Sequence, residues 1–149
     1  MRNNLMQEVI NYAKKALDQD EIPIAAAIID PKSQNIISIA HNQTIKSKDP
    51  LAHAEIIVIR DACKKLNIKR LDDYDIYVTL EPCTMCAAAI STARIKNLYF
   101  SACDEKYGSV VSNLKYFEQK NSIHKPNYYF GFKEKVSINL LQEFFAKKR

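Results

Sequence analysis

The sequence lacks any long hydrophobic run. None of its apolar stretches approaches the roughly 20 residues that a membrane-spanning helix needs. The first residues, Met1 to Asn4, also lack the apolar core of a secretory signal peptide, so we expect a cytoplasmic protein without membrane association. Internal repeats, low-complexity tracts and linkers are missing too. The 149 residues are therefore expected to form one domain, residues 1–149, with a substantial core.

The excess of basic residues is small. Twenty-two Lys and Arg residues stand against 17 Asp and Glu residues, which gives a net charge of +5. Such a mild excess favours a nucleic-acid partner only weakly. The basic C-terminal cluster, Lys147 to Arg149, has two equally weighted interpretations. It could bind phosphates, or it could be a solvated helix end that complements the helix dipole.

The sequence contains four cysteines, Cys63, Cys83, Cys86 and Cys103. An even number could form two disulfides in a secreted protein. Because there is no signal peptide, and Cys83 and Cys86 lie only three residues apart, metal binding is the better interpretation. We expect Cys63 and Cys103 to be small buried apolar residues.

Hydrophobic periodicity predicts alternating helices and strands. Helices are expected over residues 4–18, 50–66, 82–90, 110–118 and 134–149, and strands over 22–29, 36–40, 75–80, 95–102 and 128–132. Asp49 is expected to cap the second helix, with Pro50 at its first position. This order predicts an α/β fold that is layered around a mainly buried, five-stranded sheet.

Two short motifs, His53-Ala54-Glu55 and Pro82-Cys83-Thr84-Met85-Cys86, carry residues that suit zinc. Cys83 and Cys86 are expected in the first turn of a helix, where the unpaired N–H groups favour thiolates. His53 would be a third ligand. No fourth ligand has suitable spacing, since the other two histidines belong to a strand end and a loop. Three protein ligands leave one position open for water, as in catalytic zinc sites.

Glu55 follows His53 by two residues, which is about 200° around a helix. The two side chains can share a target only beyond the helix end, toward which helical side chains lean. That places the site at the carboxyl edge of the strands. A carboxylate there can move the protons of a water activated by zinc. Either motif alone also fits a solvated glutamate, a structural zinc site or a redox pair, but the joint pattern favours a catalytic zinc.

Residues 49–56 and 77–86 resemble the zinc-dependent cytidine and nucleobase deaminase superfamily, and within it most of all the bacterial tRNA-specific adenosine deaminases. Further matches are residues 21–24, Asn42, and Asp104 with the Lys and Gly that follow it. The resemblance implies a three-layer α/β/α fold with a mixed sheet, one zinc ion per chain, and a homodimer. It also implies adenosine-to-inosine editing at the wobble base of a tRNA anticodon stem-loop.

The resemblance implies a role for each matching residue. The expected zinc ligands are His53, Cys83 and Cys86, and Glu55 is the expected acid and base. The expected substrate contacts are the Asn42 side chain and the Ala54 N–H with the base, and Asp104 and the region near Phe145 with neighbouring nucleotides.

Three departures from the family pattern leave the substrate open. Ala25 replaces a usual glycine, residues 109–114 replace a segment of small residues, and residues 133–137 lack an acid-plus-cysteine pair. The alternative is a deaminase of a free base or nucleoside, such as guanine, cytosine or cytidine. A structural-zinc or nucleic-acid-binding module without catalysis is a third possibility. Several aromatic residues could stack on an unpaired base, but each is more often a core residue: Tyr107, Tyr116, Phe144 and Phe145.

Overall fold

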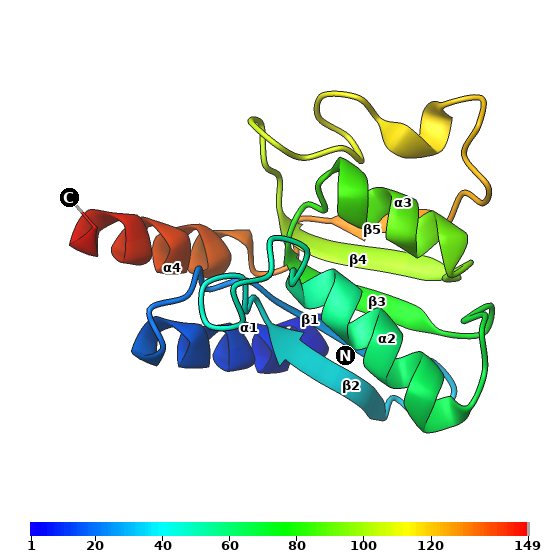
Figure 1. Ribbon diagram of the computed structural model, residues 1–149, viewed down its shortest axis with the longest axis horizontal. Coiled ribbons are helices and arrows are strands. Elements are labelled where there is room, and N and C mark those ends of the chain that lie inside the picture. Colours follow the sequence, from blue (N-terminus) through cyan, green and yellow to red (C-terminus); the bar gives the residue numbers. More distant parts are fainter. Residues whose placement is uncertain (149) are drawn as a thin grey trace.

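The computed structural model describes residues 1–148 and places a five-stranded sheet between two layers of helices (Figure 1). The strands are β1 (Ala25–Ile29), β2 (Ile36–His41), β3 (Asp75–Leu80), β4 (Asn97–Ala102) and β5 (Asn127–Phe130). The helices are α1 (Arg2–Asp18), α2 (Ala54–Leu66), α3 (Thr84–Thr92), the short 3-10 helix η1 (Tyr116–Glu118) and α4 (Glu134–Lys147). The predicted α/β/α layering is therefore confirmed.

The sheet is mixed, with the strand order β2-β1-β3-β4-β5. Strand β1 is antiparallel to both β2 and β3, whereas β3, β4 and β5 are mutually parallel. Strands β2 and β3 consequently run in the same direction, and their carboxyl ends lie at the same edge of the sheet. Helix α2 follows β2 and helix α3 follows β3, so both helices begin near that edge.

Side chains of β1 alternate between the two faces of the sheet, as strand geometry requires. Ala26 and Ile28 join the core under α2 and α3, whereas Ala25, Ala27 and Ile29 join the core under α1 and α4. All five residues are buried, because helices cover both faces. This double burial explains the unbroken apolar run in the sequence.

Helix α2 begins four residues later than predicted. Asp49 does not cap it, because its Oδ1 accepts the Leu51 N–H at 2.9 Å and its carbonyl accepts the Ala52 N–H at 3.1 Å. These bonds close a turn ahead of the helix. His53 is the N-cap residue instead, with φ −72° and ψ 149°.

Helix α3 begins at Thr84 rather than at Pro82. Cys83 is its N-cap, in extended conformation with φ −73° and ψ 175°, and forms an isolated antiparallel bridge with Gly108. The helix predicted over residues 110–118 is wrong except for η1. The N–H groups of residues 110–112 bond the Glu81 carboxylate instead of helical carbonyls.

Cys103 and the last helix differ from what the sequence predicts. Cys103 is exposed rather than buried, because it follows the end of β4, and Cys63 is half-buried. Helix α4 ends at Lys147, and Arg149 of the basic cluster lies outside the described residues. No helix within residues 1–148 combines the length and the apolar character that a membrane crossing demands.

Candidate active site

Three potential metal ligands meet where α2 and α3 begin. His53 and Cys83 are the N-cap residues of the two helices, and Cys86 lies in the first turn of α3. The Nδ1 atom of His53 lies 3.7 Å from the Cys83 sulfur and 3.5 Å from the Cys86 sulfur. The ligand atoms of all three residues lie within 4.8 Å of one another.

These separations fit a shared tetrahedral metal ion. With zinc–nitrogen and zinc–sulfur bonds of about 2.1 and 2.3 Å, tetrahedral ligands stand about 3.6 Å apart. The measured distances of 3.7 and 3.5 Å agree with that geometry without any rearrangement of the two helices. One nitrogen and two sulfurs occupy three of the four positions, so the cluster suits an open site.

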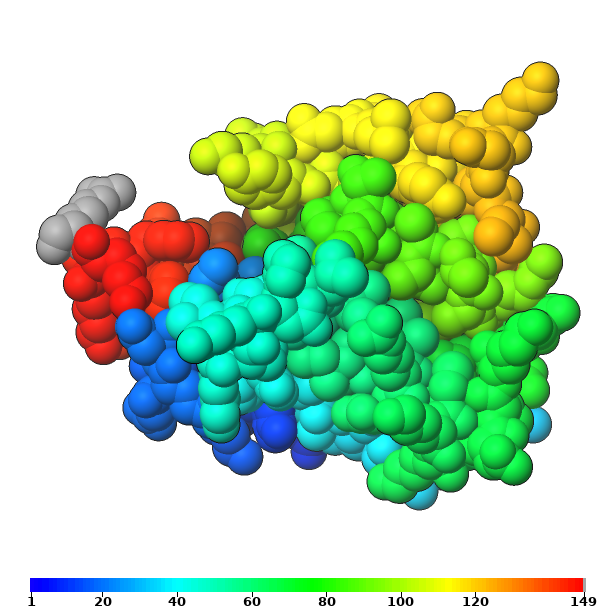
Figure 2. Space-filling model, viewed as in Figure 1, coloured from blue at the N-terminus to red at the C-terminus, as the bar shows by residue number. Residues whose placement is uncertain are grey.

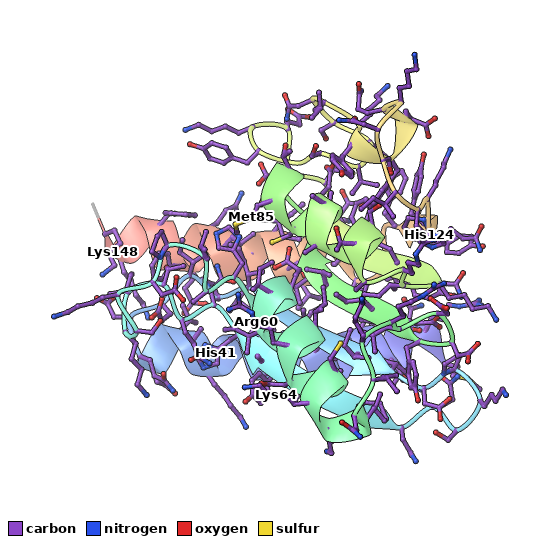
Figure 3. All side chains as sticks on the ribbon, turned by 45° about the vertical axis from the view of Figure 1, so that its right-hand side comes forward. His41, Arg60, Lys64, Met85, His124 and Lys148 are labelled. Atoms are coloured by element: carbon purple, nitrogen blue, oxygen red, sulfur yellow. The ribbon has the colours of Figure 1, made fainter. Side chains whose placement is uncertain are left out.

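The other two histidines lie outside this cluster, as the sequence predicts. The Nδ1 atom of His41 lies 2.8 Å from the Asn42 carbonyl, and the Nε2 atom of His124 lies 2.9 Å from the Ile95 carbonyl. Figure 3 places both histidines apart from Met85, which lines the cavity at the cluster. Each ring thus has a backbone partner of its own.

The three ligands influence one another's protonation. A hydrogen bond from the Cys86 thiol, together with the interaction with His53, lowers the pKa of Cys83 to about 4. The same bond, together with burial, raises the pKa of Cys86. A second hydrogen bond, between His53 and the Cys83 sulfur, raises the pKa of His53. Because a metal requires all three groups without their protons, its binding releases protons and weakens as the pH falls.

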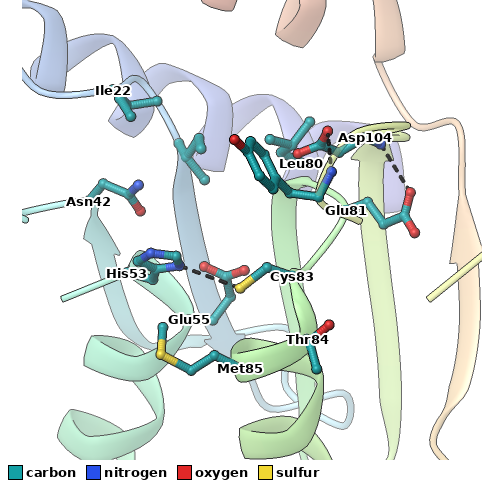
Figure 4. A pocket seen from close by; sticks show the side chains of 12 residues that line it. Ile22, Asn42, His53, Glu55, Leu80, Glu81, Cys83, Thr84, Met85 and Asp104 are labelled. Carbon is teal, nitrogen blue, oxygen red and sulfur yellow. Dashed lines mark hydrogen bonds between the residues drawn. The ribbon is translucent and has the colours of Figure 1, made fainter. Parts of the chain in front are cut away.

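Glu55 provides a buried carboxyl group beside the ligands. The side chain is 4% exposed, and burial raises the pKa of Glu55 to about 7. His53, the N-cap of α2, and Glu55, in its first turn, line the same cavity, as predicted for a target beyond the helix end (Figure 4). A carboxyl group whose pKa lies near 7 can both accept and release a proton at neutral pH.

A cavity of about 490 Å³ opens over the cluster, large enough for one nucleobase and its sugar. Figure 4 shows side chains from the strand ends and both helix starts around it. Its apolar walls are formed by Ile22, Ile24, Leu80 and Met85. Ala25 is not part of this lining, because its side chain packs on the opposite face of the sheet, under α1.

Asn42 lies in the cavity wall and is 5% exposed. Its Oδ1 accepts the Ala54 N–H at 2.8 Å, so this first N–H of α2 already has a partner. The Asn42 Nδ2 group makes no hydrogen bond within residues 1–148 and can therefore donate to a ligand. The bond fixes the orientation of the amide.

The other two predicted substrate contacts differ in position. Asp104 lines the cavity, and its Oδ1 accepts the N–H groups of Lys106 and Tyr107, both at 3.1 Å. Phe145 lies on α4, is 48% exposed, and packs edge-to-face on Phe144 rather than in the cavity. The structure places Asp104 in the same cavity as His53 and Cys83 but leaves Phe145 outside it.

Sequence reasoning missed two buried glutamates that hold loops at the cavity. Glu81 accepts hydrogen bonds from the 104–112 segment, and Glu21 accepts the N–H groups of Ile45 and Lys46 at 3.2 and 2.6 Å. Burial raises the pKa of Glu81, but the N–H donors outweigh burial and hold it below the ordinary value. The sequence offered one signal for this role, an acidic residue next to an apolar strand. A charge buried there needs hydrogen-bond partners.

A model of the MafB19-like deaminases matches residues 2–149. The chain belongs to the MafB19-like deaminase family. This deaminase is 46% identical to the tRNA-specific adenosine deaminase of Rickettsia bellii, over 97% of the chain and 99% of that relative. It is 45% identical to a solved structure from work on A-to-I editing by tRNA:A34 deaminases, with a TM-score of 0.88, over 91% of this chain and 97% of that one.

A solved guanine deaminase from Nitrosomonas europaea also superposes on this deaminase. The TM-score is 0.86, over 98% of this chain and 85% of that one, but the identity is only 20%. At that identity the likeness shows the fold alone. The fold by itself therefore does not distinguish among purine substrates.

Metal content should depend on two of the four cysteines. Replacing Cys83 or Cys86 by serine removes a ligand of the cluster, so bound zinc measured by mass spectrometry of metals should fall from about one ion per chain to below about 0.1. Cys63→Ser and Cys103→Ser serve as matched controls and should retain the ion, because neither sulfur is in the cluster. Full zinc retention in both ligand variants would contradict this site.

Proposed function

We propose that this chain is a zinc-dependent hydrolytic deaminase that converts adenosine to inosine at the wobble position of a tRNA anticodon. The observation that carries the proposal is the cluster of three ligands with a buried carboxyl group at the same cavity. The choice of substrate is supported by relatives that are 46% and 45% identical over nearly the whole chain.

His53, Cys83 and Cys86 would hold the zinc ion. When bound, zinc lowers the pKa of a water toward neutrality. The Glu55 carboxylate would accept one proton from the attacking water and pass it to the ring nitrogen of the base. It would then take the remaining proton of the attached oxygen and give it to the amino group, which leaves as ammonia. Its burial favours this shuttle, since the group has no competing ion pair within residues 1–148 and can carry the proton as a neutral acid.

The cavity has the shape and chemistry for one flipped base. Ile22, Ile24 and Leu80 would form an apolar wall against its ring, and the free Nδ2 group of Asn42 would donate to one of its acceptors. A volume of about 490 Å³ is large enough for one nucleoside. Asp104 lies where neighbouring nucleotides would pass, whereas Phe145 would contact RNA only outside the cavity.

We also propose that the protein is a homodimer, as the resemblance implies. A second hollow of about 510 Å³ lies on the outer surface of α2 and α3. Leu51, Ile56, Ile59 and Met85 contribute its apolar surface, and a second copy would cover it. A monomeric mass in solution at micromolar concentration would contradict this assembly.

The zinc-loaded protein should form inosine in a synthetic anticodon stem-loop with adenosine at the wobble position. Nucleoside analysis by mass spectrometry measures the product. A stem-loop with the adenosine moved by one position is the matched control and should react at least about 100-fold more slowly, because the flanking contacts no longer match. Ammonia release from free guanine, cytosine or nucleosides, with none from the RNA, would support the alternative substrate class and overturn the proposal.

Replacing Glu55 by Gln should separate metal binding from proton transfer. The amide keeps the size of the side chain but cannot accept and release the proton, so kcat should fall by about 10²–10⁴-fold. Zinc content should stay at one ion per chain, because Glu55 is not in the ligand cluster. Turnover of E55Q within threefold of the wild type would exclude Glu55 as the proton carrier.

A further inference from the structure

Glu81 is a buried carboxylate that the proposed chemistry does not use. It directly follows β3, is 3% exposed, and accepts five hydrogen bonds. Oε1 accepts the Asp104 N–H at 3.0 Å and the Ser112 hydroxyl at 2.7 Å. Oε2 accepts the backbone N–H groups of Val110, Val111 and Ser112 at 3.0, 2.9 and 3.0 Å. All five donors belong to residues 104–112.

The 104–112 segment depends on this carboxylate for its shape. It contains neither helix nor strand, so its N–H groups have no regular partners. Three successive N–H groups converge on one carboxylate oxygen, in the manner of the concave backbone nests that bind anions. Hydrogen bonds of this kind, to an ionised acceptor, are about twice as strong as neutral ones. Without Glu81 the buried Val110 N–H would have no acceptor.

Gly108 shows how closely the segment packs on Glu81. A Cβ atom at Gly108 would lie 2.3 Å from the Glu81 Cδ and 2.5 Å from the Asp104 carbonyl oxygen. Any larger residue would push the segment off the carboxylate. The position therefore requires glycine for close approach rather than for an unusual φ angle.

The same segment forms one wall of the cavity. Asp104 and Tyr107 line the cavity, and Tyr107 is 64% exposed, as an aromatic platform for an unpaired base would be. The segment is also joined to the ligand-bearing chain, since the Ser109 N–H donates to the Pro82 carbonyl at 2.9 Å. Figure 2 shows the connection after β4, in yellow, running along the molecule beside the green α3.

We propose that Glu81 is a positioning residue that fixes the 104–112 segment as a preformed wall for nucleotides next to the target base; this rests on the proposed deamination of a tRNA. A preformed wall lowers the entropic cost of binding RNA. Its loss should therefore weaken binding of the stem-loop, seen as a higher KM, more than it slows the chemical step. A residue that only supported the Cys83 segment would instead affect zinc content and kcat.

Glu81→Gln is the direct test, because its amide has one acceptor oxygen instead of two and must turn its NH2 group toward N–H donors of the segment. KM for the stem-loop should rise about 10-fold or more, kcat should stay within about threefold, and zinc should remain at one ion per chain. Amide hydrogen exchange of residues 110–112 should accelerate. Ser112→Ala removes one of the five bonds without touching the chain beside Cys83, and should raise KM by about threefold.

Glu118→Gln is the matched control. Glu118 lies in the same connection between β4 and β5, but it is an exposed partner of Lys125. The KM of the E118Q variant for the stem-loop should equal that of the wild type.

Unchanged KM in both E81Q and S112A, with an active wild type, would overturn the proposal. Loss of zinc in E81Q with unchanged S112A would also overturn it, in favour of mere support for the ligands. A wild type that forms no inosine would instead contradict the proposed function, before any variant is compared.

Discussion

The structure depends on two helices that begin at one edge of the sheet. Because β1 is antiparallel to both of its neighbours, β2 and β3 point the same way, and α2 and α3 start side by side at their ends. His53 and Cys83 are the N-cap residues of these helices. An N-cap residue has extended backbone, so its side chain reaches beyond the helix end, toward the other helix. Sheet topology thus sets the distance between a nitrogen and a sulfur that lie 30 residues apart in the sequence.

The same helix ends influence the chemistry of the groups that they hold. The Cys86 backbone N–H and the positive end of the helix dipole favour a thiolate at Cys83. Glu55 lies one residue into α2 and is buried, which raises its pKa toward neutrality. The Asn42 side chain accepts the first N–H of α2, and this hydrogen bond fixes the orientation of its amide. Two buried carboxylates, those of Glu21 and Glu81, then hold the loops beside the cavity, where regular secondary structure is missing.

The sequence predicts that His53, Glu55 and the two cysteines share one site, and the structure places them together, because short spacings decide the grouping: two residues from His53 to Glu55 and three between the cysteines. It predicts the layers because strands buried on both faces are apolar throughout. It fails where one residue type has several uses. Asp49 can cap a helix or a turn, and only the neighbouring bonds show that it does the latter. An acidic residue after an apolar strand marks Glu81 in the sequence, but its partners were out of reach, because they are mostly backbone N–H groups that leave no trace in residue identity.

Three protein ligands would hold a metal with one position open at the cavity. X-ray absorption at the zinc edge of the loaded protein tests this arrangement most directly. The account predicts two sulfur neighbours at about 2.3 Å and two lighter neighbours at about 2.0–2.1 Å, of which one is an imidazole nitrogen and the other an exchangeable oxygen. Three or four sulfur neighbours, or a second imidazole in place of the oxygen, would mean a closed structural site and would contradict the account.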